Sequence, residues 1–484
     1  MNEINNYLQG LFNANNIVIP SYRINLFNEF VVSTDCAEVV KEIFENQTKL
    51  LEMWKEKNRI TDFVVHQMII PNATVGKEFS FSIDFKKLGF DDINIVGFDA
   101  LEGTGLSFNI ITNTLEGSPI VSGDLNFNLR FNIIGQFDTS IIFQKPLTLI
   151  VNSDPRTLWK NLPSDKEDIF WKEDNVTSFG KLGTKHIVVS SKRGRSHQNV
   201  GSFRDDDFEF KYFEKTGWSL VVVADGAGSA TFARKGSQLA CNAVIDYFEN
   251  HSDIEKAKEF EAKLFKYNFS KDDLLLKEIE VMAKQNLYRT TLFVHNKLKE
   301  FADQTYNNHP ELFNNLKAKN PIDYFHSTLI FTLFKKYEFG YLIMSFSVGD
   351  CPIALMNENN TETTLLNWLD VGEFGGGTRF ITQNEIFHST QRPMSTRFNL
   401  KIIKEFSYLF LMTDGIYDAK FEVEVNLEKN EKWIDFIEDL QGKNDNHFQV
   451  KLNATNSEVR EELSNWMDFW SIGNHDDRTL AIIF

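Results

Sequence analysis

Residues 218–229 read Trp218-Ser-Leu-Val-Val-Val-Ala-Asp225-Gly226-Ala-Gly228-Ser229. The uninterrupted apolar run is typical of a strand that is buried on both faces. It ends at Asp225 on a glycine-rich turn, before a helix that we expect to begin near Ala233. Rigid backbone holds a carboxylate at the end of a core strand in place, as a metal ligand requires, and the glycine after it lets a backbone carbonyl approach an ion. Taken alone, an Asp-Gly pair after a strand is more often an ordinary turn.

The same arrangement recurs along the chain. Three further acidic clusters lie beside predicted strands: Asp205-Asp206-Asp207, Asp414-Gly415 and Asp476-Asp477. Each cluster by itself is more often a solvated loop. Carboxylates that converge on one pocket repel one another unless cations lie between them. Oxygen ligands select Mg²⁺ or Mn²⁺ over zinc, and the chain has no Cys/His spacing that would favour zinc.

Composition excludes several classes of protein. The 484 residues allow two to four domains at roughly 150 residues each. Apolar residues make up 42% and charged residues 25%, as in ordinary globular proteins. The 51 Lys and Arg residues stand against 68 Asp and Glu residues, a net charge of −17 that argues against sequence-independent nucleic-acid binding. A local basic patch around Lys192, Arg193 and Arg195 stays open as an alternative.

The cellular compartment follows from what the sequence does not contain. No stretch approaches the ~20 apolar residues of a membrane helix, and residues 1–12 lack the pattern of a secretory signal. Cys36, Cys241 and Cys351 are far apart, which suits a reducing compartment. We therefore expect a soluble, cytoplasmic protein that binds neither nucleic acid nor a membrane.

Hydrophobic periodicity divides the chain into four segments. Residues 1–68 are predicted to be helical, and residues 69–152 alternate apolar and polar positions, as half-buried strands of a small β-sandwich do. Residues 153–185 are interpreted as an ordered connector, and residues 186–484 mix strands and helices. In the first segment one stripe of apolar residues is expected to form a packed helix face: Val40, Ile43, Phe44, Leu51 and Trp54.

The predicted sandwich resembles the bacterial immunoglobulin/cadherin-like modules. The resemblance covers about residues 72–152 and rests on turn residues. These are Gly76-Lys77-Glu78-Phe79-Ser80, Gly105-Leu106-Ser107-Phe108, Gly117-Ser118-Pro119 and Ser122-Gly123-Asp124. It implies a fold and no chemistry, and we expect this region to act as a protein-docking module.

The acidic clusters belong to an ordered series of short motifs. In chain order they are Arg204-Asp205-Asp206-Asp207-Phe208, Val223-Ala-Asp225-Gly226-Ala-Gly228, Ser327-Thr328, Val348-Gly349-Asp350, Thr413-Asp414-Gly415 and Asp476-Asp477-Arg478-Thr479. Over residues 186–484 this series resembles the metal-dependent type 2C protein phosphatases. Two further motifs, Gly194-Arg195-Ser196-His197 and Gly372-Glu373-Phe374, resemble a bacterial branch of that family, which often acts beside bacterial Ser/Thr kinases. The implied fold class is α+β, a four-layer α-β-β-α sandwich after the helical segment and the all-β module.

The resemblance also implies a site for two Mn²⁺ or Mg²⁺ ions. Carried over by motif, Asp225 bridges both ions, the Gly226 carbonyl binds the second, and Asp414 and Asp476 complete the first. Two cations lower the pKa of a bridging water, so that hydroxide attacks phosphorus in line.

Three more acidic residues match family positions. Asp205 and Asp206 match the pair that binds the second ion and its waters, so Asp206 joins Asp225 as a catalytic candidate. Asp323, four residues before Ser327, matches the position of a third, weaker metal. An ordinary helix-capping or loop role is the alternative for Asp323.

Two family positions carry different residues here. Gly201 replaces the arginine that usually grips the phosphate, and Arg195 and Arg204 are the nearest substitutes, each with an ordinary surface role as the alternative. Ala227 replaces a histidine that follows Asp-Gly in many eukaryotic members. His197 or a metal-held water is then the candidate for protonating the leaving group, and a local structural role is the alternative for His197.

The expected function is hydrolysis of phosphoserine and phosphothreonine in phosphoproteins, in opposition to a bacterial Ser/Thr kinase. One alternative is a pseudophosphatase that binds phosphoproteins or scaffolds a kinase without turnover, which the two departures favour. A second alternative keeps the hydrolase and gives it a small phosphoester or nucleotide.

Overall fold

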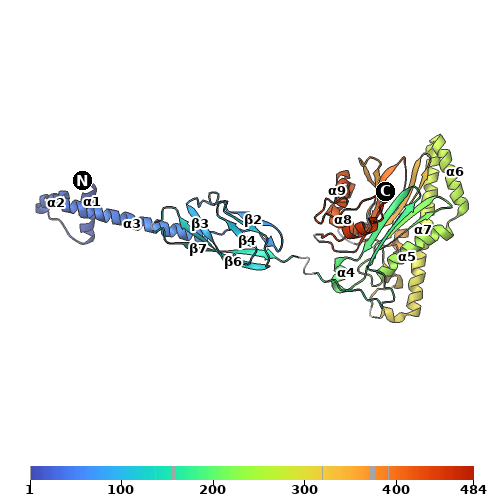
Figure 1. The fold of residues 1–484 in the computed structure, drawn as a ribbon, viewed down its shortest axis with the longest axis horizontal. Coiled ribbons are helices and arrows are strands. Elements are labelled where there is room, and N and C mark those ends of the chain that lie inside the picture. The colour runs from blue at the N-terminus through green and yellow to red at the C-terminus, as the bar shows by residue number, and fades with distance from the viewer. Residues whose placement is uncertain are drawn as a thin grey trace. The chain divides into compact units, whose positions relative to one another are not determined.

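The computed structural model describes residues 2–136, 138–154, 159–314, 316–318, 320–370, 377–390, 392–471 and 473–484. The Gly372-Glu373-Phe374 motif lies outside these residues. The chain divides into two compact units, Met1–Leu158 and Trp159–Phe484, called here the first and the second unit (Figure 1). No helix in the described ranges is both long and apolar enough to cross a membrane.

The first unit begins with helices. They are α1 (Asn2–Ala14), η1 (Ser21–Arg23), α2 (Ile24–Val32) and α3 (Thr34–Val65). Ser33 caps α3 by accepting a hydrogen bond from the Cys36 N–H at 3.4 Å. A small core of Leu8, Phe27, Val31, Cys36 and Val40 joins the three α-helices.

The expected packed face of α3 is only half correct. Val40 is buried in the small core, and Phe44 packs against it. Leu51 and Trp54 are 62% and 63% exposed, because α1 and α2 cover only the first turns of this 32-residue helix.

Two sheets follow α3 and form the expected β-sandwich. One sheet has the order β1 (Ala73–Thr74), β7 (Phe143–Asn152), β6 (Gly123–Ile133) and β3 (Ile93–Asp99), and the other β2 (Phe79–Ser82), β5 (Thr114–Gly117) and β4 (Leu106–Asn109). Alternate residues of β6, such as Leu129 and Phe131, are buried. Phe63 of α3 belongs to the same core, and the Lys145 ammonium donates to the carbonyls of Phe63, Val64 and His66 at the end of α3.

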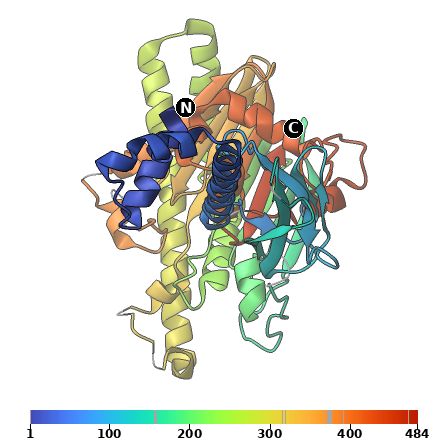
Figure 2. The same cartoon turned by 90° about the vertical axis from the view of Figure 1, so that its left-hand side faces the viewer.

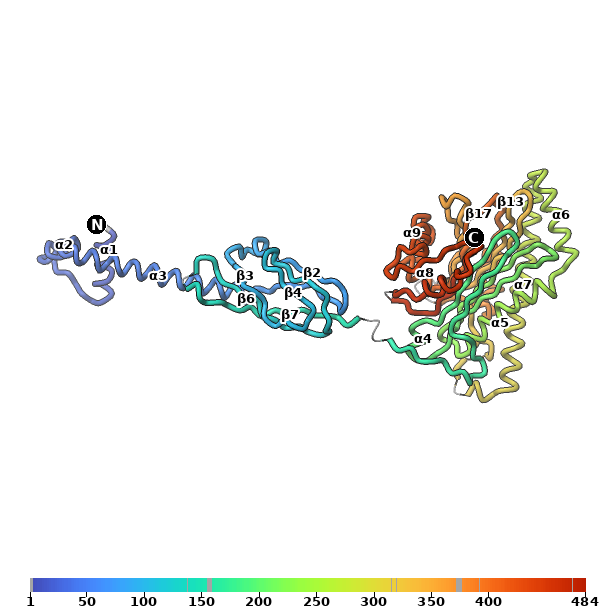
Figure 3. The backbone as a smooth tube through the Cα atoms, viewed as in Figure 1, coloured from blue at the N-terminus to red at the C-terminus, as the bar shows by residue number. Residues whose placement is uncertain are grey.

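The second unit is built around two antiparallel sheets. The five-stranded sheet has the order β10 (Asp207–Phe213), β11 (Trp218–Ala224), β12 (Leu329–Tyr337), β13 (Gly340–Val348) and β16 (Phe398–Ile403). The six-stranded sheet has the order β15 (Thr363–Leu365), β14 (Ile353–Asn357), β17 (Phe406–Met412), β18 (Arg478–Ile483), β9 (Lys185–Lys192) and β8 (Asn175–Leu182). Figure 3 shows the red C-terminal strand β18 beside the green strands from the start of the unit.

Helices cover the outer face of each sheet. Beside the five-stranded sheet are α5 (Ala233–Asp246), α6 (Ile254–Ser270) and α7 (Asp273–Asn308). Beside the six-stranded sheet are α8 (Asp414–Phe421), α9 (Asn430–Leu440) and α10 (Val459–Trp466), while the short α4 (Arg195–Val200) follows β9. Figures 1 and 2 show α7, in yellow-green and yellow, running along the outer helical layer.

The continuous apolar runs follow from these four layers. In β11, Leu220, Val222 and Ala224 face the core shared with the helices, whereas Val221 and Val223 face the core between the two sheets. Strands β17 and β18 divide their side chains between two cores in the same way. The α-β-β-α sandwich is therefore confirmed, and the runs Leu220–Ala224, Leu409–Met412 and Leu480–Ile483 are apolar because both of their faces are buried.

The connector expected at 153–185 is largely part of the second unit. Residues 175–182 form its edge strand β8, and the unit begins at Trp159. Lys172 is 7% exposed and donates to the Asp206 carbonyl at 2.7 Å, to the Asp207 carboxylate at 2.9 Å and to the Ser237 hydroxyl at 3.3 Å. The segment therefore supports the acidic strand β10 through a buried charge.

Replacing Lys172 with Met is expected to destabilise the second unit by about 3–5 kcal/mol, because it removes one partner of a buried ion pair. Lys166→Met is the matched control, since exposed Lys166 only lies near the Trp171 ring, and it should change stability by less than about 0.5 kcal/mol. Urea denaturation followed by tryptophan fluorescence measures both. Equal, small effects would contradict the assignment of residues 159–185 to this unit.

Candidate metal centre

Four of the acidic side chains singled out in the sequence meet at one edge of the second unit, where strands of both sheets end: Asp206, Asp225, Asp414 and Asp476. Asp206 precedes β10 and Asp225 follows β11, and these strands pair with Asp207 opposite Ala224. Asp414 follows β17 and Asp476 precedes β18, and these strands pair with Met412 opposite Leu480. Both pairs therefore end in carboxylates.

Electrostatics shows that these carboxylates share one site. Burial raises the pKa of Asp225 well above its usual range, and the charges of Asp414, Asp206, Asp350 and Asp476 raise it further. The pKa of Asp414 is raised for the same reasons, with burial first and the charge of Asp476 next. The protein thus holds like charges together in a place of low polarity, which costs stability unless cations neutralise them.

The turn at Asp225 is fixed by the motif Ser327-Thr328. The Asp225 N–H donates to the Thr328 hydroxyl at 2.9 Å, and its carbonyl accepts from the Thr328 N–H at 2.7 Å and the Ser327 hydroxyl at 3.0 Å. A side chain at Gly226 would place its Cβ 2.6 Å from the Asp205 carbonyl oxygen, so only glycine lets the two acidic segments approach this closely.

Asp206 joins the two sheets. It is 1% exposed, and its Oδ2 accepts hydrogen bonds from the hydroxyls of Thr413 at 2.8 Å and Thr479 at 2.7 Å. Burial and the charge of Asp477 raise its pKa to about 8 in spite of these bonds. The sequence reasoning missed both threonines, although each lies within three residues of a predicted ligand.

Asp350 is a further member of the site to which the sequence reasoning gave no role. It follows β13, and its ligand oxygen, that of Asp225 and the Cys351 sulfur lie within 4.8 Å of one another. Its Oδ2 accepts from the Thr378 hydroxyl at 2.7 Å, whereas its Oδ1 is buried and has no hydrogen-bond partner among the described residues. Its position after a buried strand was the available signal.

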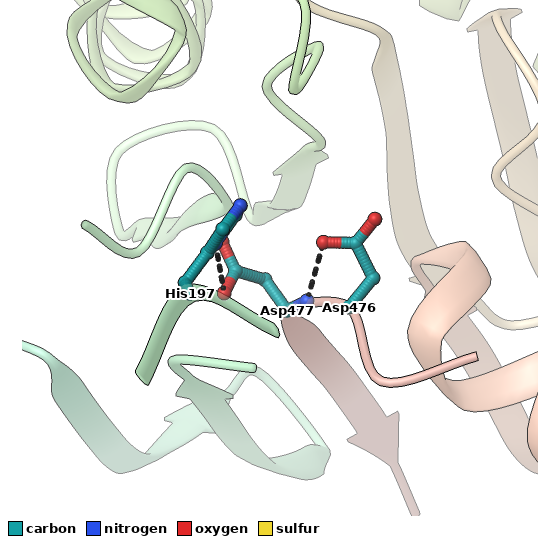
Figure 4. A group of neighbouring side chains, drawn as sticks. All are labelled: His197, Asp476 and Asp477. Carbon is teal, nitrogen blue, oxygen red and sulfur yellow. Dashed lines mark hydrogen bonds and ion pairs between the residues drawn. The ribbon is translucent and has the colours of Figure 1, made fainter. Parts of the chain in front are cut away.

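His197, Asp476 and Asp477 form a second group whose ligand atoms lie within 4.8 Å of one another (Figure 4). Figure 4 shows the Asp477 carboxylate turned towards His197 and the Asp476 carboxylate turned away from it. His197 Nδ1 lies 2.9 Å from Asp477 Oδ1 and His197 Nε2 lies 3.9 Å from Asp205 Oδ2. Although burial opposes ionisation, the hydrogen bond to Asp477 raises the pKa of His197 to about 10.

Asp477 organises the backbone around this group. Its carboxylate accepts from the N–H groups of Gly194 at 2.6 Å and Asp205 at 2.5 Å, so it connects β9, β10 and β18. Although burial opposes it, the hydrogen bond from His197 lowers the pKa of Asp477. The side chain therefore serves as a fixed negative charge that orients His197 and the Asp205 segment.

The two candidate arginines differ in accessibility. Arg204 is 2% exposed and donates to the Glu173 carbonyl, the Ser191 hydroxyl and the Asp206 carbonyl, so it supports the acidic segment, and the surface role considered for it is wrong. Arg195 begins α4, is half-buried and donates to the Asp468 carbonyl at 2.8 Å. Gly201 ends α4 with φ at 73°, a left-handed conformation that an arginine adopts only with strain.

Asp323 lies in the 3₁₀ turn η5 (Pro321–Phe325), where it completes a capping box with Asn320. Its Oδ2 accepts from the Asn320 N–H at 3.2 Å. The helix-capping role is therefore realised, and a third metal at Asp323 stays a prediction.

The donor set suits a hard divalent cation. It consists of carboxylate oxygens held at strand ends, and one of them, Asp350 Oδ1, is buried without a partner among the described residues. Mg²⁺ and Mn²⁺ take oxygen ligands of this kind. The residues present therefore fit the metals that the sequence resemblance implies.

A family model matches this chain, and several solved structures are similar to it. The family model described as Protein phosphatase 2C matches residues 193–468. Similar solved structures include Stp1 from Staphylococcus aureus, a serine/threonine phosphatase (15% identity, 63% of this chain and 96% of that chain covered, TM-score 0.32). Others are the serine/threonine phosphatase of S. agalactiae (14% identity, 62% and 99% covered, TM-score 0.35) and RsbX in complex with magnesium (14% identity, 64% and 98% covered, TM-score 0.33).

A search of curated proteins found no match. The family match spans more than half of the chain and includes Asp205, Asp206, Asp225, Asp350 and Asp414. The chain belongs to the protein phosphatase 2C family.

Proposed function

We propose that this chain is a metal-dependent protein phosphatase that hydrolyses phosphoserine and phosphothreonine. The observation that carries the proposal is the convergence of Asp206, Asp225, Asp350, Asp414 and Asp476 at one sheet edge, with their pKa values raised by burial. A protein with no use for cations would be more stable without this cluster.

The proposed centre holds two Mn²⁺ or Mg²⁺ ions. Asp225, the Gly226 carbonyl, Asp414 and Asp476 would bind one or both, and Asp205 and Asp206 would bind the second ion and its waters. Asp350 joins this set because its oxygen lies beside that of Asp225. When bound, such ions supply Lewis-acid stabilisation of phosphoryl oxygens and lower the pKa of a water nucleophile.

The chain's own residues position this chemistry. Thr413 and Thr479 orient the Asp206 carboxylate, while Asp477 holds His197 with its Nε2 towards Asp205. With Arg204 buried, Arg195 and His197 on α4 are the candidates for contact with the substrate phosphate. The hydrogen bond to Asp477 raises the pKa of His197, so we propose His197 as the proton donor to the leaving group. The physiological substrate is proposed to be a phosphoprotein, made by a Ser/Thr kinase that this enzyme opposes.

The pseudophosphatase alternative keeps two observations in its favour, Gly201 and Ala227 at family positions of arginine and histidine. It predicts weak metal binding and no turnover. The retained cluster of buried carboxylates favours the active enzyme, because a binding module has no need of charges that repel one another.

We expect the chelator-treated full chain to release phosphate from phosphothreonine and phosphoserine peptides only after Mn²⁺ is added. Release is measured with a phosphate dye, and p-nitrophenyl phosphate and a nucleotide monophosphate serve as small phosphoesters. Faster turnover of the peptides supports a protein substrate. Turnover of small phosphoesters alone would favour the second alternative, and no turnover by the folded, metal-loaded chain would favour the pseudophosphatase.

A further inference from the structure

A short segment of the second unit that begins at Thr378 contacts the turns of two candidate metal ligands. The Thr378 hydroxyl donates to Asp350 Oδ2 at 2.7 Å. Further along the segment, the Ile381 N–H donates to the Ser327 carbonyl at 2.9 Å, and the Ser327 hydroxyl donates to the Asp225 carbonyl at 3.0 Å. One segment therefore supports both the turn that follows β13 and the turn that follows β11.

The helix α7 holds this segment, residues 378–382, from the other side. His295 of α7 is 7% exposed, and its Nδ1 lies 2.9 Å from the Ile381 carbonyl oxygen. Because a carbonyl only accepts, the Nδ1–H of His295 is the donor. The Phe387 ring packs edge-on against the His295 ring with centroids 5.2 Å apart, and Ile381 is fully buried in the core that α7 shares. Apolar packing and one buried hydrogen bond thus fix the segment to the helix.

The bond distinguishes His295 from other buried polar residues of the same helix. The hydroxyls of Thr291 and Thr305 donate to carbonyls of α7 itself, whereas His295 donates to a different segment. For packing alone an apolar side chain would serve better, since burying a polar group costs free energy unless the group is hydrogen-bonded. The imidazole therefore serves the contact between α7 and the segment.

We propose that His295 is a positioning residue for the metal centre. Its hydrogen bond fixes segment 378–382 against α7, and the segment in turn holds the turns of Asp225 and Asp350. The proposal rests on the proposed function, because it takes these carboxylates to bind Mn²⁺ or Mg²⁺. His295 acts through the segment, and its role requires no contact with an ion.

The first test compares the Mn²⁺ affinity of the full chain with that of two variants by calorimetric titration. His295→Leu keeps an apolar side chain and removes the donor, and Mn²⁺ is expected to bind about tenfold more weakly, as after loss of a contact behind a metal ligand. His295→Asn places an amide N–H near the position of Nδ1, so its affinity should return towards that of wild type. Equal affinities of His295→Leu and wild type would overturn the proposal.

A variant elsewhere on α7 controls for loss of stability alone. Ile279 is fully buried in the same core and lies 16 residues before His295, about 24 Å along the helix. Ile279→Ala is expected to destabilise the second unit without changing Mn²⁺ affinity, and circular dichroism checks that every variant is folded at the titration temperature. If Ile279→Ala weakens Mn²⁺ binding as much as His295→Leu does, packing of α7 explains the effect and the proposal is wrong.

Hydrogen exchange of the metal-free chain separates this proposal from the proposed function. In His295→Leu the Ile381 amide should exchange at least about tenfold faster than in wild type, because losing the bond lowers the free energy of opening the segment. The Asp225 amide should also exchange faster. Unchanged exchange at both amides would overturn the proposal even if wild type binds Mn²⁺. A wild type that binds no Mn²⁺ would instead overturn the proposed function, and with it the role of His295 at a metal centre, whatever the exchange rates.

Discussion

Asp225→Asn is expected to abolish metal-dependent phosphate release and, at the same time, to raise the melting temperature of the metal-free protein. We expect activity to fall at least about a hundredfold, because replacing even a residue that only contacts a metal ligand lowers metal affinity or activity about ten- to hundredfold. The gain in stability follows because Asp225 is buried beside Asp414, Asp206, Asp350 and Asp476, and an amide removes its share of the repulsion. We expect the free energy of unfolding of the metal-free variant to exceed that of the metal-free wild type by about 1–3 kcal/mol.

Thermal melting with and without Mn²⁺ measures the second effect. Wild type should gain stability from Mn²⁺, whereas Asp225→Asn should start higher and gain little. The backbone bonds of Asp225 to Thr328 are kept in this variant, so its fold is not at risk. Asp303→Asn is the matched control, because Asp303 is exposed and paired with Lys299 at 2.8 Å. If the metal-free Asp225→Asn variant is less stable than metal-free wild type, repulsion among the buried carboxylates does not destabilise the metal-free protein.

Gly226→Ala is expected to cost about 1–3 kcal/mol of stability and to weaken metal binding. The new Cβ would lie 2.6 Å from the Asp205 carbonyl oxygen and 2.9 Å from backbone atoms of Ala233. These are main-chain atoms on both sides, so the turn can make room only by moving the Asp205-Asp206 segment or the start of α5.

Gly228→Ala, two residues further on, is the control within the same turn. A Cβ at Gly228 meets nothing within 4 Å, so we expect a change of less than about 0.5 kcal/mol. Urea denaturation and calorimetric titration with Mn²⁺ compare the two variants. If both alanine variants are equally stable and bind Mn²⁺ equally well, Gly226 is not needed for the close approach of the two acidic segments.

Two strand ends could be predicted from the sequence because the segments before them are buried on both faces and form uninterrupted apolar runs. Leu220–Ala224 and Leu409–Met412 face two cores at once, and the first polar residue after each run is therefore near the end of the strand. Acidic residues at several such ends indicated a shared acidic site, and the structure brings Asp225, Asp414 and Asp476 together at one sheet edge.

Contacts between the sheets could not be predicted in this way. The hydrogen bonds of Thr413 and Thr479 to Asp206 depend on how the six-stranded sheet lies against the five-stranded one, and periodicity within a strand does not contain that information. Asp350 was missed for a related reason, since its role depends on the distance to Asp225. For Arg204 the sequence left open a phosphate-gripping role and a surface role, because an arginine is rarely buried, but here backbone carbonyls satisfy its buried guanidinium.

In the helical segment the sequence predicts which residues form the apolar face, but not which elements cover it. The spacing of Val40, Phe44, Leu51 and Trp54 predicts one packed face, but only Val40 and Phe44 are packed, because an apolar face does not say what covers it. Helices α1 and α2 are too short to cover the whole of α3.

An anomalous-difference map of a Mn²⁺-soaked crystal of the full chain, recorded near the manganese absorption edge, tests the central claim most directly. Strong peaks are expected at the sheet edge, within coordination distance of Asp225 and flanked by Asp414, Asp476, Asp206 and Asp350. Manganese peaks confined to other surfaces, with these carboxylates unoccupied at saturating Mn²⁺, would contradict a metal centre at this site and the phosphatase mechanism proposed from it.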